Sequence, residues 1–170
     1  MLNFLFRGLT AASPRGAALF DAVTAEARDP HWYVEGGIPD TLDGRFAMLA
    51  TIAALAIVRL EQLGEDGNWL SVALTERFID VMEAEHRELG LGDPSVGKTV
   101  RKLVGLLSGR VDLIRSAVAG ASKWRGCVRR SLYKDEPAGD ALAHASASLK
   151  DLWAKLERAE IAMLAEGTFE

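Results

Sequence analysis

The stretch that most constrains the fold is a charge-free run of thirteen residues, Phe46 to Val58, which reads FAMLATIAALAIV. A helix of this sequence carries apolar side chains on nearly every side, and such helices are buried in a core. The run is too short for a membrane span, which requires about 20 residues. It therefore predicts a central helix that ends near Gln62 and is capped at its start by Asp40, Thr41 or Asp43.

The rest of the 170-residue chain reads as helices joined by loops, and no segment alternates with the period of two that strands require. Ser13, Pro14 and Pro30 mark the start and stop of a first helix. Further helices are expected at about 69–88, 96–119 and 139–165, with a short one near 127–133. The length suggests one domain. We expect an all-α bundle of six or seven helices over residues 13–170, preceded by an apolar tail at 1–12.

Two connecting stretches are expected to be irregular. HWYVEGGIPDTLDGRF, at 31–46, contains Gly36, Gly37 and Pro39, which break helices, so it is interpreted as a loop. Its apolar residues Trp32 and Ile38 predict that this loop folds back on the core. LGEDGN, at 63–68, is interpreted as the turn after the central helix.

Residues 92–99 match the P-loop pattern G-x-x-x-x-G-K-[ST]. A true P-loop comes directly after a buried strand, whereas the preceding DVMEAEHREL is charged and helical in character. Pro94 has no N–H for a phosphate, and Asp93 would bring a carboxylate into an anion site. We therefore interpret the stretch as a turn between two helices, with Lys98 exposed in the first turn of the second. Binding of an anion at that helix start stays open.

The sequence gives little support for a metal site or a catalytic site. Cys127 is the single cysteine, which excludes a disulfide or a cysteine-based metal site within one chain. Neighbouring arginines could lower the pKa of its thiol, but we interpret it as an ordinary helix-face cysteine. His31, His86 and His144 are not spaced as a ligand cluster, and His86 is expected to be exposed. No metal or cofactor is expected.

Acid–base chemistry by paired carboxylates is the weaker interpretation of the acidic residues around the Gly36–Gly37 pair. Glu35, Asp40 and Asp43 lie close together in the sequence. Capping of the central helix explains Asp40 or Asp43 more simply than catalysis.

Charge is unevenly distributed along the chain. Between Asp93 and Arg130 there are nine basic and two acidic residues, so this segment carries +7 and the remainder −11, for a net charge of −4. Three interpretations stay open: a solvated helix face, an anionic partner such as RNA or an acidic protein, and anionic lipid. Trp124 lies between Lys123 and Arg125, which favours an interface.

Three stretches together resemble a known family: WYVEGGIPDTLDGRF, RELGLGDPSVGKTVRKL and VRRSLY. Their order and spacing, from Ser13 to Tyr133, are similar to those of the ubiquinol–cytochrome c chaperone family, and the composition suits a bacterial member. The resemblance implies an all-α protein that is not an enzyme. It also implies a role in assembling ubiquinol–cytochrome c reductase, by binding newly made cytochrome b.

The expected partner-binding residues come from these motifs and from the basic segment. They are Tyr33, Ile38, Pro39, Asp40, Arg45, Asp93, Lys98, Arg101, Lys102, Arg129 and Arg130. Mitochondrial members of the family work with a small helper protein and associate with the ribosome. For this chain both partners stay open, and DNA binding is not expected.

A second hypothesis is a helical carrier of a small apolar ligand such as haem or quinone. A closed, deep apolar pocket into which His31 or His86 points would favour the carrier, and an open apolar patch beside a basic surface would favour the chaperone. The N-terminal MLNFLFRGLT lacks the features of a signal or transit peptide. We therefore expect a cytoplasmic protein, and this apolar stretch could attach it peripherally to the cytoplasmic face of the inner membrane.

Overall fold

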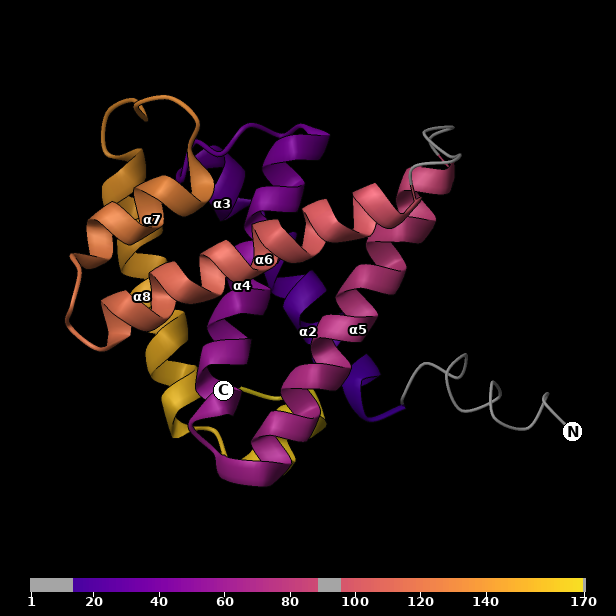
Figure 1. Ribbon diagram of the computed structural model, residues 1–170. Coiled ribbons are helices and arrows are strands. Elements are labelled where there is room, and N and C mark those ends of the chain that lie inside the picture. Colours follow the sequence, from indigo (N-terminus) through magenta and orange to yellow (C-terminus); the bar gives the residue numbers. More distant parts are fainter. Residues whose placement is uncertain (1–13, 89–95, 170) are drawn as a thin grey trace, which may run out of the picture.

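Residues 14–88 and 96–169 are described by the structure, a computed structural model, and within them lie eight helices and no strand (Figure 1). The helices are α2 (Pro14–Ala27), α3 (His31–Val34), α4 (Leu42–Glu61), α5 (Gly64–Glu88), α6 (Val96–Val118), α7 (Trp124–Leu132), α8 (Ala141–Arg158) and α9 (Ile161–Ala165). The all-α prediction is confirmed. The number of helices exceeds the expected six or seven because α3 forms inside the expected loop and because α8 and α9 are separate.

α4 is the centre of the bundle. Every residue from 50 to 58 is buried, and Leu55 is 0% exposed. Thr51, the one polar residue in this run, donates a 2.7 Å hydrogen bond from its hydroxyl to the carbonyl oxygen of Ala47, so its burial leaves no polar group unpaired. α2, α5, α6, α7 and α8 all pack on α4, and Figure 1 shows α6 crossing it. The prediction of a central buried helix is confirmed.

The N-terminus of α4 is capped by Thr41 and by neither aspartate. The Thr41 hydroxyl oxygen accepts a 3.2 Å hydrogen bond from the backbone N–H of Gly44. Gly44 itself is required here, because a Cβ atom would collide with the carbonyl oxygen of Pro39. Capping by Asp40 or Asp43 was the wrong explanation for those residues, since both carboxylates bind cationic side chains.

The expected turn at 63–68 is also wrong, because α5 begins at Gly64. Gly64 has a φ of +76°, which lets the chain reverse direction shortly after the end of α4. Glu65 and Asp66 then lie in the first turn of α5, where the helix dipole favours negative charge. The acidic residues that led us to expect a turn at 63–68 therefore form the start of a helix.

The last expected helix is divided at Ala159 and Glu160, whose backbones are extended. Arg59, on α4, donates 2.9 Å hydrogen bonds to the carbonyl oxygens of Leu156 and Glu157 at the end of α8. The last carbonyl groups of a helix have no hydrogen-bond partner within that helix. Arg59 supplies the partner, so it caps the C-terminus of α8. The residue that stabilises this boundary is separated from Leu156 by 97 positions in the sequence.

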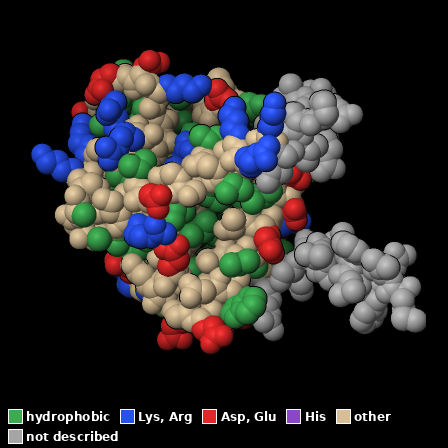
Figure 2. Space-filling model, in the orientation of Figure 1, with side chains coloured by type: hydrophobic (Ala, Val, Ile, Leu, Met, Phe, Trp, Pro, Cys, Tyr) green, Lys and Arg blue, Asp and Glu red, His purple; other side chains and the backbone are tan. Residues whose placement is uncertain are grey.

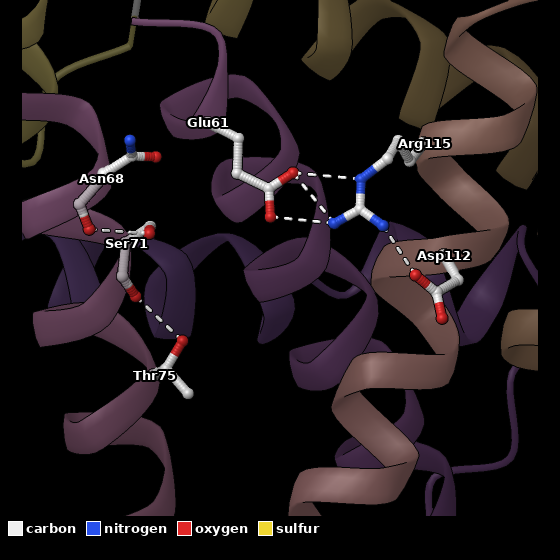
Figure 3. A network of polar contacts seen from close by, with 6 residues as sticks. All are labelled: Glu61, Asn68, Ser71, Thr75, Asp112 and Arg115. Carbon is white, nitrogen blue, oxygen red and sulfur yellow. Dashed lines mark hydrogen bonds and ion pairs between the residues drawn. The ribbon is translucent and has the colours of Figure 1, made fainter. Parts of the chain in front are cut away.

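Arg115 on α6 forms ion pairs with Glu61 at the end of α4 and with Asp112 on α6, so it links the two helices (Figure 3). Its guanidinium lies 2.9 Å from Oε1 of Glu61 and 2.6 Å from Oδ1 of Asp112. All three side chains are substantially exposed, so the network sets geometry more than it adds stability. No helix among the described residues is both long and apolar enough to cross a membrane.

Candidate binding groove

A groove of about 1130 Å³ opens where α2, α3, the start of α4, the end of α5 and the start of α6 meet. Its apolar lining comes from all five helices and from the α2–α3 connection. These lining residues are Phe20, Ala27, Pro30, Val34, Leu42, Phe46, Leu49, Val81, Met82, Leu103 and Leu106. Below this lining lies the core around α4, to which Phe20, Met82 and Leu103 belong. The groove, hereafter the five-helix groove, is therefore an apolar surface that the bundle leaves accessible.

Several apolar side chains at the five-helix groove face solvent. Val34 is 75% exposed, Leu42 56% and Leu106 37%. Exposed apolar residues are common singly, but a cluster of them in a concave surface marks an interaction site. The groove thus has the character of a surface that a partner covers.

The rim of the five-helix groove is charged, with both signs present. Asp21, Arg28, Asp40, Asp43, Arg45, Glu85 and Lys102 contribute to it. Asp40 accepts a 2.6 Å ion-paired hydrogen bond from Nε of Arg45, and this bond lowers the pKa of the Asp40 carboxyl. Lys134 lies 2.6 Å from Asp43 and likewise lowers the pKa of that carboxyl. Asp40 and Asp43 remain ionised, so they contribute fixed negative charge and do not serve as proton donors.

A basic face adjoins the groove on α6. Lys98, Arg101 and Lys102 are all exposed, and Lys102 is also part of the groove rim. The other side of α6 buries an apolar stripe of Leu103, Leu107, Val111 and Ile114. Figure 2 shows basic side chains over α7 and over the start of α6 next to the grey residues, with apolar patches between them. The α6 basic face, formed by Lys98, Arg101 and Lys102, is therefore a surface that the fold does not need for packing.

The expected partner-binding residues divide into groups. Tyr33, Asp40, Arg45 and Lys102 line the five-helix groove. Lys98 and Arg101 lie on the α6 basic face, and Pro39 is exposed beside the groove residue Asp40. Arg129 and Arg130 are exposed on α7, where Arg129 lies 3.8 Å from Glu136. Ile38 is 1% exposed, so its side chain supports the loop from within, and Asp93 lies outside the described residues.

The segment at 31–41 is held against the bundle by hydrogen bonds that no local pattern indicates. Trp32 is 0% exposed and donates from Nε1 to the carbonyl oxygen of Glu26 at 2.9 Å. The hydroxyl of Tyr33 donates to the carbonyl oxygen of Ala27 at 2.7 Å, and burial raises the pKa of this phenol. The prediction that the segment folds back on the core is confirmed, although its first residues form α3.

Two residues directly after α7 complete this attachment. Tyr133 donates a 2.6 Å hydrogen bond to the carbonyl oxygen of Gly36, and Lys134 pairs with Asp43 from 91 positions away. The sequence alone did not indicate either contact. The aromatic residue in VRRSLY was the available signal, because a tyrosine in a family motif suggests a specific hydroxyl contact.

Cys127 is 1% exposed, and burial raises the pKa of its thiol. Arg130 acts to lower that pKa, as the sequence suggested a nearby arginine could, but desolvation outweighs it and the net shift is upward.

The described residues contain no group of three or more His, Cys, Asp or Glu side chains that could hold a metal ion. Nevertheless, His31 and His144 lie together, which the sequence spacing did not predict: Nδ1 of His31 is 2.9 Å from Nε2 of His144.

The first half of the P-loop-like stretch, residues 92–95, lies outside the described residues, and the second half, 96–99, forms the start of α6. On its N-terminal side is α5, a 25-residue helix, and on its C-terminal side α6 begins at Val96. A P-loop requires a strand before the phosphate-binding turn. Helices lie on both sides of the stretch and Lys98 is exposed in the first turn of α6, as predicted, whereas the predicted turn itself falls outside the described residues.

Comparison with known proteins agrees with the motif resemblance. The family model "Ubiquinol-cytochrome C chaperone" matches residues 34–169. The structure is similar to the crystal structure of the Cbp3 homolog from Brucella abortus, with 25% sequence identity and a TM-score of 0.79, over 100% of this chain and 97% of that chain. A search of curated protein sequences gave no match. Since the family model covers most of the chain, including the C-terminal helices beyond Tyr133, the protein belongs to the ubiquinol–cytochrome c chaperone family.

Proposed function

We propose that this protein is an assembly chaperone that binds newly made cytochrome b during biogenesis of ubiquinol–cytochrome c reductase, with the five-helix groove as the client site. The observation that carries the proposal is the open apolar groove bordered by the α6 basic face, in a chain of this family. The proposed action is binding without chemical change of the client.

The size and chemistry of the groove suit one apolar helix of a membrane protein. A helix with its side chains is about 10–12 Å across, and its apolar face can lie in a hydrophobic groove while charged rims set its orientation. Leu42 and Leu106 would contact such a helix directly, since both line the groove and both are exposed. A chaperone that covers one client helix would shield apolar surface that is otherwise prone to aggregate.

The α6 basic face gives the client site a direction. Lys98, Arg101 and Lys102 would attract acidic loops beside the bound helix, and they would raise the rate of encounter by long-range attraction. Charges on the rim of an interface affect association and specificity more than they affect final affinity. The groove would thus supply affinity and the basic face would supply orientation.

The carrier hypothesis receives less support. The five-helix groove has seven charged residues on its rim, and His31 does not line it. The His31 ring instead lies against Trp32 and His144, with ring centroids 4.2 Å and 5.1 Å apart. A haem or quinone site would need a more enclosed apolar cavity.

The test places a charge in the groove. Leu42→Glu and Leu106→Glu alter two exposed lining residues, so both variants should fold with nearly unchanged melting temperature. Cytochrome b captured by the tagged protein from solubilised membranes of the native host should fall at least about tenfold, which corresponds to about 1.4 kcal/mol. Immunoblotting for cytochrome b measures the captured amount.

Trp69→Glu and Val72→Glu are the matched controls. These residues are also exposed and apolar, at 69% and 51%, but they lie on α5 outside the groove lining. The controls should retain capture. Equal loss in both pairs would show that general surface apolarity matters and that the groove does not.

Peripheral attachment to the membrane is a second part of the proposal. Its motivation is the apolar MLNFLFRGL sequence, which lies outside the described residues. The full chain should co-float with vesicles that contain anionic lipid, and deletion of residues 1–9 should reduce co-flotation. Unchanged flotation after deletion would assign any membrane contact to the folded domain.

A further inference from the structure

A second cluster of exposed apolar side chains lies on α5, outside the five-helix groove. Trp69 is 69% exposed and Val72 51%, and neither lines the groove. They are three residues apart, so they are neighbours on one face of the helix. Glu65 and Glu76 continue this face at spacings of four residues, and both are exposed. The α5 stripe, formed by Glu65, Trp69, Val72 and Glu76, is thus an apolar patch with a carboxylate at each end.

The first described helix begins beside this stripe. α2 packs along α5, and a Cβ atom added to Gly16 would lie only 3.0 Å from the carbonyl oxygen of Ala73. Ala73 is four residues after Trp69, so these two residues are neighbours on the surface of α5. Pro14, where α2 begins, is two residues before Gly16. The chain that precedes α2 therefore joins the described structure close to the α5 stripe.

Residues 1–12, the apolar tail expected from the sequence, are chemically complementary to the stripe. Their large apolar residues are Met1, Leu2, Phe4, Leu5, Phe6 and Leu9. Arg7 is their one charged residue, and no acidic residue precedes Asp21. The thirteen residues before Pro14 can extend about 43 Å, whereas the stripe is about 17 Å long at about 1.5 Å per helical residue. The tail is therefore long enough to cover the stripe, and its charge is opposite to that of the carboxylates.

We propose that residues 1–12 dock on the α5 stripe. Their leucine and phenylalanine side chains would contact Trp69 and Val72, and Arg7 would face the carboxylates at the ends of the stripe. The covalent link to α2 gives the tail an effective concentration on the order of millimolar, which favours it over a second copy of the chain. This inference does not rest on the proposed function, because it involves neither the five-helix groove nor the client. A docked tail would not be available to lipid, so the α5 stripe would compete with a membrane for the same side chains.

The test detects the tail beside Trp69 directly. The chain has four tryptophans, so full-length protein that carries fluorotryptophan gives four fluorine resonances, and Trp69→Phe identifies that of Trp69. A nitroxide spin label is attached to Asn3→Cys, and Cys127 does not compete for the label because it is 1% exposed. The label should broaden the Trp69 resonance, and reduction of the nitroxide should sharpen it again. The resonance of Trp124 should stay sharp, because Figure 1 shows α7 on the opposite side of the bundle from the start of α2.

Variants of the tail separate docking from the mere proximity of a tethered segment. Phe4→Ser with Phe6→Ser should abolish the broadening, because it removes two apolar contacts and keeps the tether. Thr10→Ser with Ala12→Ser introduces the same number of serines into the tail and should retain the broadening. The proposal is overturned if the labelled chain keeps a sharp Trp69 resonance, or if the broadening survives the two phenylalanine changes.

Variants of the stripe and a mixed sample identify the occupant. Val72→Glu should abolish the broadening, whereas Val104→Glu, at a 40% exposed position on α6, should retain it. Both positions are exposed, so both variants should keep their fold, which circular dichroism checks. When labelled chain without fluorine is mixed with fluorinated chain without label, the Trp69 resonance should stay sharp. Broadening in this mixture would overturn the proposal and assign the stripe to a second copy of the chain, and equal loss from Val72→Glu and Val104→Glu would overturn it as well.

Discussion

The hydroxyl of Tyr133 donates a 2.6 Å hydrogen bond to the carbonyl oxygen of Gly36, 97 positions earlier in the chain. Both residues lie in stretches that carry the family resemblance, WYVEGGIPDTLDGRF and VRRSLY. Gly36 is buried, and a Cβ atom there would collide with the carbonyl oxygen of Trp32. Two motifs far apart in the sequence thus meet at one contact, which holds the segment that lines the five-helix groove.

Tyr133→Phe removes this hydrogen bond and leaves the ring in place. We expect a loss of about 1 kcal/mol in the free energy of unfolding, because the carbonyl oxygen of Gly36 would lose its partner. Amide hydrogen exchange at 36–41 should accelerate, as measured by mass spectrometry. Thr75→Val removes a hydrogen bond within α5 instead, from the Thr75 hydroxyl to the carbonyl oxygen of Ser71, and should leave exchange at 36–41 unchanged.

The same tyrosine predicts an alkaline effect on stability. Burial raises the pKa of Tyr133 from 10.0 to about 12. As the pH rises above about 10, the unfolded chain loses this proton before the folded chain does, so the stability that Tyr133 contributes falls until about pH 12. Urea unfolding from about pH 9 to 11 should therefore show a steeper decline for the unaltered chain than for Tyr133→Phe. Parallel declines would contradict the burial of this hydroxyl.

Leu55→Ala tests the central position of α4. Leu55 is 0% exposed, and truncating a fully buried leucine costs about 2–5 kcal/mol. Leu42→Ala is the same chemical change at a 56% exposed position of the same helix, and it should cost less than about 0.5 kcal/mol. Denaturant unfolding measures both values. Similar small losses in both variants would mean that α4 is not the core of the protein.

The contrast between α4 and α5 shows which part of the fold was accessible from sequence. Periodicity and a charge-free run depend on one helix alone, so α4 was predicted within a few residues of its observed bounds. The start of α5 depends on the positive φ of Gly64, and the end of α8 depends on Arg59 from α4. Conformation at a single glycine and contacts between distant segments leave no periodic signal.

The candidate site shows the same division. Exposure of Lys98, Arg101 and Lys102 could be inferred from helix geometry, since the apolar stripe of α6 fixes the opposite face. The ion pair of Asp43 with Lys134 and the contact of His31 with His144 could not, because they join residues 91 and 113 positions apart. The five-helix groove forms only where five helices meet, so no single segment of the sequence indicates it.

Glu26→Gln tests the half-buried carboxyl group of Glu26, in the last turn of α2. Burial raises the pKa of Glu26, against the opposing influence of Lys155 and His31, so the folded protein holds this proton more tightly than the unfolded chain does. A carboxyl with a raised pKa lowers stability once the pH exceeds its unfolded value. Glu26→Gln should therefore raise the melting temperature at about pH 7, and this advantage should shrink as the pH falls below about 5. Glu76→Gln, at an exposed position on α5, controls for the removal of one carboxylate.

The last prediction concerns the α6 basic face. Changing Lys98, Arg101 and Lys102 together to glutamate should leave a folded helical protein, because all three side chains are exposed. If this face orients the client, the same change should reduce capture of cytochrome b and lower the cellular content of ubiquinol–cytochrome c reductase. Capture by the unaltered protein should also weaken with added salt, since exposed charges are screened over about 10 Å at about 0.1 M.

A matched variant separates position from total charge. The variant changes Lys123 and Arg125, which are exposed at the start of α7, and Lys150, which is exposed on α8. Their change to glutamate likewise removes two lysines and one arginine. Loss of capture only in the α6 variant would mean that the client meets this face. Equal loss in both variants would mean that overall charge steers the encounter. Normal reductase assembly in a folded α6 variant would refute a role for the basic face, and binding would then rest on the five-helix groove alone.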